Sequence, residues 1–364
     1  MTPCDQGDLA SLLLSGTPLI DVRAEVEFAK GAIPGSINLP ILDSAERERV
    51  GTCYRQRGPE AAVALGHTLV NAAAKESRVA AWCGFLRAHP DASLYCWRGG
   101  LRSRTASEWV AEAGLRVPVV PGGYKALRQR LIEELAQPVP TENWHIIGGR
   151  TGSAKTALLN ALAGGIDLEG FARHRGSSFG RRAGVSPGQI DFENALALAL
   201  LRHRRLSPGR SLFLEDESRQ IGALSIPLEV YGRMRASPVA VLEVPLEQRV
   251  SKILDDYIRV DLEEHLALDA LRGFEHFALQ LEASLGRIRK RLGAERFQVA
   301  SGLLQSALEA HRSRGETEGH RGWITLLLAQ YYDPMYDYQL ASAAERIVFR
   351  GTAAEVLEWA RSRR

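Results

Sequence analysis

Short apolar runs alternate with amphipathic stretches in the first third of the chain. The run Ala92-Ser93-Leu94-Tyr95 is followed by a glycine-rich turn, which is typical of a buried strand. A helical pattern over about 101–113 follows, then a β-rich run at 117–120 and a helix opened by Gly122-Gly123-Tyr124. Strands that alternate with helices predict a parallel sheet covered by helices. The fold class we expect is therefore α/β.

The same alternation restarts after the proline-punctuated stretch 137–140, which is typical of a linker. The pattern predicts strands at 144–147, 212–214, 239–244 and 346–351, and helices at 157–163 and 352–361. Between these, amphipathic helical spacing dominates. We predict two domains, 1–137 and 138–364, the second with a mostly helical insertion at about 246–337.

Composition restricts the class of protein further. A chain of 364 residues is long enough for two cores, and no apolar run is long enough to cross a bilayer. The N-terminus lacks a signal-peptide pattern, so we expect a cytoplasmic enzyme with no membrane partner. The four cysteines have no paired spacing, which argues against a disulfide framework, a structural metal and a redox cofactor. The net charge of +3 says little about nucleic acid.

Cys96 is the first candidate for chemistry. It ends the strand at 92–95 and opens the loop Cys96-Trp97-Arg98-Gly99-Gly100-Leu101-Arg102-Ser103, which leads into a helix. Backbone N–H groups at such a turn bind anions and favour the thiolate. Arg98 and Arg102 add positive charge that lowers the thiol pKa further. We predict that Cys96 is a nucleophile and that Arg98 and Arg102 assist it.

Residues 5–135 resemble the rhodanese family. The resemblance rests on Asp21-Val22-Arg23, on the run from Gly31 to Pro40, on the cysteine loop and on Gly122-Gly123-Tyr124. The seven-residue loop from Cys96 to Arg102 is one residue longer than in sulfur-transferring rhodaneses and resembles that of dual-specificity phosphatases, whose pocket admits a tetrahedral phosphorus group. An inactive rhodanese-like module is the alternative, but such modules usually lack the cysteine.

A phosphate-binding P-loop follows the strand at 144–147. Gly149, Gly152, Ser153, Lys155 and Thr156 are the residues we expect to hold a diphosphate, mainly through backbone N–H groups and the lysine. Ala154 replaces the usual glycine before the lysine, which weakens the case for rapid ATP hydrolysis. The Thr156 hydroxyl and the carboxylates of Asp216 and Glu217, after the strand at 212–214, are candidate Mg²⁺ ligands.

Basic residues cluster downstream of the P-loop. The candidates for contact with RNA or another substrate are Arg173, His174, Arg175, Arg181 and Arg182. Any single run of this kind is more often a solvated face paired with acids. The aromatic segment 331–338 either stacks on bases or lines an apolar pocket, unless it only packs in a core.

Taken together, these motifs resemble the tRNA 2-selenouridine synthase family over essentially the whole chain. The resemblance implies replacement of sulfur by selenium in 2-thiouridine at the tRNA wobble position. It further implies selenophosphate and geranyl diphosphate as substrates, an S-geranyl-2-thiouridine intermediate, and a selenophosphate-supplying enzyme as a partner. The helical insertion is where we expect the geranyl chain to bind.

Two other functions stay open at this point. One is a rhodanese-type sulfurtransferase fused to a nucleotide-dependent kinase or ATPase. The other is a non-catalytic nucleotide-binding module. The longer cysteine loop and Ala154 favour the selenium transferase over the first alternative, and the intact cysteine loop argues against the second.

Overall fold

The computed structural model describes residues 6–136 and 143–363, which form two compact units. Unit 1 takes the described residues of Met1–Gln137 together with Gly188–Arg205. Unit 2 takes those of Pro138–Pro187 and Leu206–Arg364. The sequence boundary at 137 separates most of the two units, but it assigns 188–205 to the second domain, whereas these residues pack with the first.

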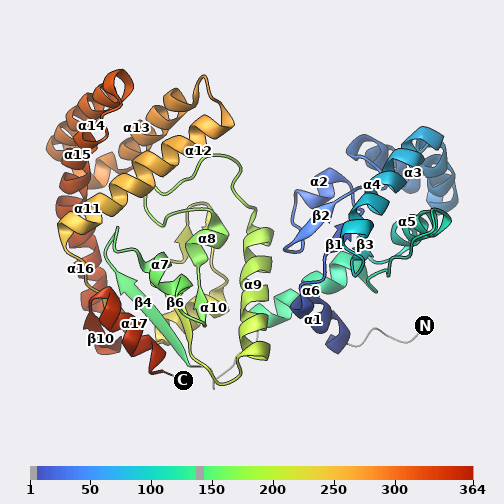
Figure 1. The fold of residues 1–364 in the computed structure, drawn as a ribbon, viewed down its shortest axis with the longest axis horizontal. Coiled ribbons are helices and arrows are strands. Elements are labelled where there is room, and N and C mark those ends of the chain that lie inside the picture. The colour runs from blue at the N-terminus through green and yellow to red at the C-terminus, as the bar shows by residue number, and fades with distance from the viewer. Residues whose placement is uncertain (1–5, 137–142, 364) are drawn as a thin grey trace. The chain divides into compact units, whose positions relative to one another are not determined.

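Unit 1 contains a three-stranded parallel sheet in the order β2-β1-β3, as the alternating pattern predicts. Its strands are β1 (Leu19–Asp21), β2 (Ser36–Asn38) and β3 (Ser93–Tyr95). The run at 117–120 adds only a single bridge, Val119 beside Leu94. The helices of the N-terminal segment are α1 (Gln6–Ser15), α2 (Glu25–Phe28), α3 (Ser44–Leu69), α4 (Ala72–Ala88), α5 (Leu101–Glu112) and α6 (Gly123–Ala136) (Figure 1).

The Asp-Val-Arg motif has a structural role at the end of β1. Asp21 and Arg23 form a fully buried ion pair, with Arg23 Nη2 2.7 Å from Asp21 Oδ2. The same nitrogen donates to the Gly31 carbonyl at 2.9 Å, and the guanidinium lies over the Tyr124 ring at 3.8 Å from the centroid. Buried charge is tolerated only when it is paired and hydrogen-bonded in this way. The motif therefore ties β1 to the next loop and to α6.

Helix α9 (Gln189–Leu206) completes unit 1. Asn194 donates to the Ala32 carbonyl at 2.6 Å, and Arg128 on α6 donates to Asn194 at 2.7 Å. Near the other end, Arg204 binds the Glu134 carboxylate at 2.7 Å. These contacts join residues far apart in the sequence, so no local pattern predicts them.

Unit 2 is built on a five-stranded parallel sheet in the order β10-β9-β4-β6-β5. The central strands are mostly apolar and almost entirely buried, which is usual for a parallel sheet. Its strands are β4 (Trp144–Gly149), β5 (Gly165–Ile166), β6 (Leu212–Glu215), β9 (Val239–Leu242) and β10 (Ile347–Gly351), and β7 (Gln220–Ile221) pairs with β8 (Leu224–Ser225) outside it. The helices around the sheet are α7 (Lys155–Asn160), α8 (Leu168–Ala172), α10 (Leu228–Ala236) and α17 (Ala353–Arg361).

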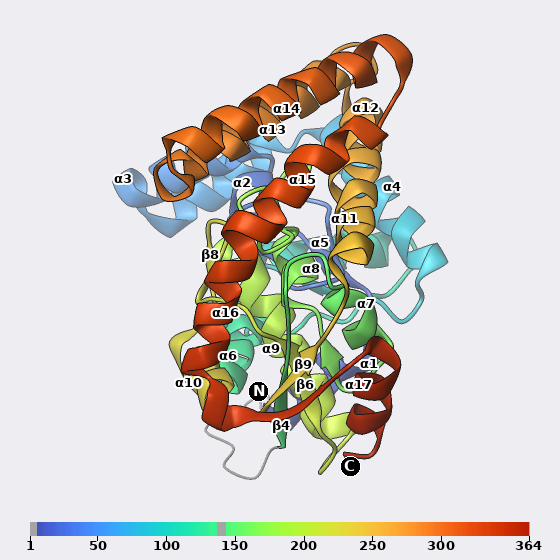
Figure 2. The ribbon, with the colours of Figure 1, turned by 90° about the vertical axis from the view of Figure 1, so that its left-hand side faces the viewer.

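A helical block separates β9 from β10, as the sequence pattern predicts. Its helices are α11 (Leu246–Leu254), α12 (Val260–Leu268), α13 (Gly273–Leu292), α14 (Ala294–Arg314), α15 (Arg321–Leu327) and α16 (Asp333–Ser342). The block has its own apolar core, which includes Phe277, Leu281, Leu304 and Trp323. Within unit 2, α12 to α15 gather at the end away from α17 (Figures 1 and 2). Among the described residues, no helix is long and apolar enough to span a membrane.

Candidate functional site

The cysteine loop of unit 1 has the strand-to-helix form that the sequence predicts. Cys96 follows β3 directly, and Gly100 precedes the first residue of α5. Gly99 has φ of 65°, and a Cβ there would lie 2.7 Å from the Val120 carbonyl oxygen. The Tyr124 N–H donates to the Cys96 carbonyl at 2.8 Å. The start of α6 therefore holds the loop, and glycine is required because the two backbones touch.

The environment of Cys96 favours its thiolate form. Burial by itself raises the pKa of the Cys96 thiol. The Ser103 hydroxyl, the backbone N–H groups of Arg98 and Ser103 and the charge of Arg102 act in the opposite direction, and the net pKa lies below its usual value. Ser103 Oγ is buried and has no other hydrogen-bond partner, so it is free to donate to the sulfur. Cys96 therefore has the properties of a nucleophile.

Cys96, Arg98 and Arg102 all line one cavity of about 580 Å³. Arg102 is fixed by Glu27 on α2, with Nη1 2.5 Å from Glu27 Oε2. Arg47 on α3 approaches the same carboxylate at 3.4 Å. Arg98 is exposed at the cavity edge. The structure thus brings the three predicted residues together and adds Glu27, which sequence reasoning did not identify.

The P-loop of unit 2 follows β4 and lines a second cavity of about 680 Å³. Gly149, Gly152, Ser153, Lys155 and Thr156 all lie in its wall. Lys155 begins α7, and its Nζ donates to the Gly149 carbonyl at 3.0 Å. Ala154 adopts the left-handed conformation, with φ 60° and ψ 36°, which glycine adopts without steric cost. Ala154 therefore holds a backbone conformation that favours glycine, the residue usual at this position.

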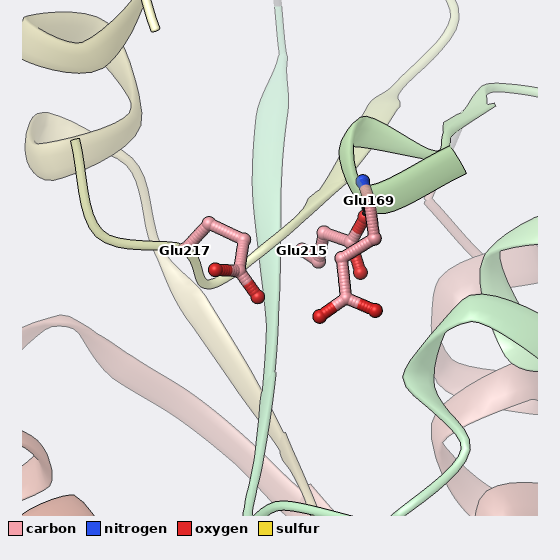
Figure 3. A group of neighbouring side chains, drawn as sticks. All are labelled: Glu169, Glu215 and Glu217. Carbon is pink, nitrogen blue, oxygen red and sulfur yellow. Dashed lines mark hydrogen bonds between the residues drawn. The ribbon is translucent and has the colours of Figure 1, made fainter. Parts of the chain in front are cut away.

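A cluster of three carboxylates lies in the same region. Glu169 on α8, Glu215 at the end of β6 and Glu217 just after it have ligand oxygens within 4.8 Å of one another (Figure 3). The Glu169 N–H donates to Glu215 Oε1 at 2.8 Å, while Glu215 Oε2 is buried without a hydrogen-bond partner. Burial raises the pKa of Glu169 and of Glu215, and repulsion adds to it, from Glu217 on Glu169 and from Glu169 on Glu215.

This donor set fits a divalent cation. Three carboxylates, one of them with an unpaired buried oxygen, are the hard ligands that Mg²⁺ prefers. Glu169, Glu215 and Glu217 would hold the ion, which would supply positive charge beside bound phosphates. Of the three residues predicted for Mg²⁺, Glu217 belongs to the cluster. Thr156 and Asp216 line the cavity but are not in the cluster, and Arg235 lies 3.7 Å from Asp216.

The predicted substrate-contact residues divide into two groups. His174, Arg175 and Arg182 line the P-loop cavity, whereas Arg173 and Arg181 do not. Arg175 pairs with Asp261 at 3.0 Å and Arg182 pairs with Glu264, so acids on α12 hold both guanidiniums. Arg173 donates to the backbone carbonyls of 183 and 185. The aromatic segment of the helical block also reaches the cavity, through Tyr331, Tyr332, Met335 and Tyr336.

Comparison with known proteins identifies the family. The family model described as "tRNA 2-selenouridine synthase AAA domain" matches residues 142–364, and the "Rhodanese-like domain" model matches residues 5–130. A protein of Cupriavidus necator named tRNA 2-selenouridine synthase is 49% identical over 98% of this chain and 98% of its own length. This chain belongs to the tRNA 2-selenouridine synthase family.

Other members of the tRNA 2-selenouridine synthase family are almost as similar. One from Pseudomonas fluorescens is 47% identical and covers 99% of both chains. One from Marinobacter nauticus is 46% identical over 99% of this chain and 98% of its own. The similarity thus includes both units and both cavities.

Sequence reasoning missed Ser103, Glu27, Glu169 and Glu215 as members of these sites. Ser103 is seven positions after Cys96 in the sequence, and a serine there is not distinctive by itself. Only its complete burial in the structure identifies it as part of the site. Glu27 on α2 and Glu169 on α8 lie far in the sequence from the motifs they join, so the sequence carried no signal for them. Glu215 carried a signal, since it ends the strand beside the P-loop, where P-loop folds place acidic side chains.

Proposed function

We propose that this chain converts 2-thiouridine at the wobble position of tRNA into 2-selenouridine. The observation that carries the proposal is its identity of 46–49% with proteins of that name along nearly the entire chain. Two cavities with different chemistry support it: one contains a cysteine whose pKa is lowered, and the other is lined by the P-loop.

The P-loop cavity fits a geranylation step. In this step the sulfur of 2-thiouridine attacks C1 of geranyl diphosphate, so that an S–C bond forms while the C–O bond breaks and diphosphate leaves. Lys155 and the P-loop N–H groups stabilise the negative charge on the departing diphosphate. A cation held by the three carboxylates would supply further positive charge. ATP hydrolysis is not required by this chemistry.

The Cys96 cavity fits the selenium step. Selenium from selenophosphate forms a bond to C2 of the base, and the C2–S bond breaks with loss of geranylthiol. Water then hydrolyses the P–Se bond, so that phosphate leaves and 2-selenouridine remains. Alkylation makes the sulfur a better leaving group than a thiocarbonyl sulfur. The arginines and loop N–H groups around Cys96 suit the selenophosphate oxyanion. A selenophosphate-supplying enzyme would be the partner for this step.

The test is mass spectrometry of nucleosides from tRNA that carries 2-thiouridine. Incubation with the protein, geranyl diphosphate and selenophosphate should give 2-selenouridine. Without selenophosphate, S-geranyl-2-thiouridine should accumulate, and without geranyl diphosphate the 2-thiouridine should persist. Absence of 2-selenouridine from the complete mixture would contradict the proposal.

A further inference from the structure

The cavity beside Cys96 is more apolar than a pocket for a small tetrahedral anion needs to be. It encloses about 580 Å³, within the range typical of sites for organic ligands. Among its lining residues, Tyr54, Val63, Trp97 and Leu101 are exposed large hydrophobic side chains. Apolar side chains gathered at an open hollow mark a site that a ligand covers. The cavity therefore suits a ligand with a sizeable apolar part.

Helix α3 forms the long wall of this cavity. Gly58 has φ 85° and ψ 178°, which breaks the helix just before Pro59. On one side of this break Arg47, Val50 and Tyr54 line the cavity, and on the other side Pro59, Ala62 and Gly66 do so. Spacings of three and four residues place each set on one helix face. The kink at Gly58 thus turns one face of each half of α3 toward the same cavity.

The charged residues around the cavity indicate which group is attached to the apolar part of the ligand. Among the described residues, none of those lining it is Asp or Glu, whereas four are arginines. Arg47 and Arg102 share Glu27, but Arg55 and Arg98 have no ion-pair partner within the described part of the chain. An apolar chain joined to an anionic group is complementary to this lining.

We infer that the cavity binds the geranyl chain of the S-geranylated nucleotide, with Arg55 and Arg98, which have no ion-pair partner among the described residues, available to its phosphates. This inference rests on the proposed function and gives its second step a substrate-selecting site. The geranyl group lies along α3, while the reacting nucleotide lies beside Cys96. Burial of the chain selects geranylated over unmodified 2-thiouridine, and the same cavity receives the geranylthiol that leaves. The geranyl chain thus has a site in unit 1, separate from the P-loop cavity where geranyl diphosphate binds.

Gly66→Leu tests this site because it fills the cavity with little strain. Gly66 is helical, and a Cβ there would meet only Val50 Cγ2, at 3.9 Å. Leucine also has a higher helix propensity than glycine. The matched control is Gly84→Leu on α4, where a Cβ meets nothing within 4 Å and the residue does not line the cavity.

The measurement is the dissociation constant for an anticodon-loop RNA that carries either S-geranyl- or S-methyl-2-thiouridine. The wild-type protein and Gly84→Leu should bind the S-geranyl RNA at least tenfold more tightly than the S-methyl RNA. Gly66→Leu should lose most of this preference while it binds the S-methyl RNA as the wild type does. Val63→Ser, which removes apolar wall surface at an exposed position, should reduce the preference severalfold.

Two results would overturn the inference: no preference in the wild-type protein, or a full preference in both Gly66→Leu and Val63→Ser. If Gly66→Leu weakens binding of both RNAs, Val63→Ser decides the matter, because its exposed position leaves the fold intact. Failure of the proposed function would look different, since the wild-type protein would then make no 2-selenouridine in the nucleoside assay.

Discussion

Ser103 is a residue whose buried hydroxyl affects the reactivity of another side chain. It is fully buried in the first turn of α5 and lowers the pKa of Cys96. Replacing it with alanine removes one donor to the thiolate without changing the loop glycines. The energy of one such hydrogen bond is about 1 kcal/mol, which corresponds to roughly a fivefold change in an equilibrium.

Ser103→Ala should raise the pKa of Cys96 toward its usual value. The higher pKa leaves less thiolate at neutral pH. The variant should therefore be alkylated by iodoacetamide about fivefold more slowly than the wild type at pH 7. The two rates should converge above about pH 10, where both sulfurs are ionised. Peptide mass spectrometry separates Cys96 from the buried Cys53 and Cys83. Equal rates at pH 7 would contradict the assigned role of Ser103.

Ala154 carries a backbone cost that can be measured directly. Ala154→Gly should raise the free energy of unfolding by about 1 kcal/mol, because the left-handed conformation at φ 60° clashes with a Cβ. The control is Ala157→Gly within α7, which should lower the free energy of unfolding by up to about 1 kcal/mol because glycine is a poor helix former. Denaturant-induced unfolding measures the free energy for both variants. Changes of the same sign in the two variants would argue against strain at Ala154.

At the scale of elements, the helical block contains a buried histidine pair. His320 Nδ1 accepts a hydrogen bond from Trp323 Nε1 at 3.0 Å, and His320 Nε2 lies 3.3 Å from His311 Nδ1. Because Nδ1 accepts, the neutral ring has its proton on Nε2 and donates to His311. Burial, with a smaller contribution from His311, lowers the pKa of His320 to about 4. Protonation of this ring would break the contact with Trp323.

The pH dependence of stability follows from that lowered pKa. An unfolded histidine binds a proton near pH 6.5, whereas folded His320 does so only near pH 4, so stability should fall as pH drops through this window. The loss should approach ~3 kcal/mol. Chemical denaturation across pH 4–7 measures it. His320→Gln should make the slope shallower, because other histidines with lowered pKa values still contribute, whereas His276→Gln, at an exposed position on α13, should leave the slope unchanged. An unchanged slope in His320→Gln would contradict this account.

At the scale of the whole molecule, the two proposed half-reactions use cavities in different units. Each cavity is lined by residues of one unit only. Cys96, the proposed nucleophile, belongs to unit 1, and the P-loop, the proposed diphosphate site, belongs to unit 2. Single substitutions should therefore separate the two steps.

Cys96→Ala should abolish formation of 2-selenouridine and leave geranylation within about twofold of the wild type.

Lys155→Ala should slow geranylation by about a hundredfold, because it removes a charge from the diphosphate site. The same variant should still convert RNA that is already S-geranylated into RNA with 2-selenouridine. Nucleoside mass spectrometry follows both steps. Cys83→Ala, at a buried cysteine that does not line the cavity, is the matched control. Loss of both steps in a folded Cys96→Ala would contradict the separation.

Much of this architecture is local in origin, and the sequence by itself determined it. The turn after Cys96 and the P-loop before Lys155 depend on glycines and on strand-to-helix transitions between neighbouring residues. The helical block followed from amphipathic spacing in the same way. These features are determined by backbone conformation and side-chain periodicity, which neighbouring residues specify.

Only the tertiary structure decided which distant side chains meet. Glu169 joins Glu215 because α8 packs beside β6, and α9 joins unit 1 through contacts with residues 32, 128 and 134. The apolar wall of the Cys96 cavity arises where the kinked α3 faces the cysteine loop. No local pattern specifies such meetings, because they depend on how whole elements pack against one another.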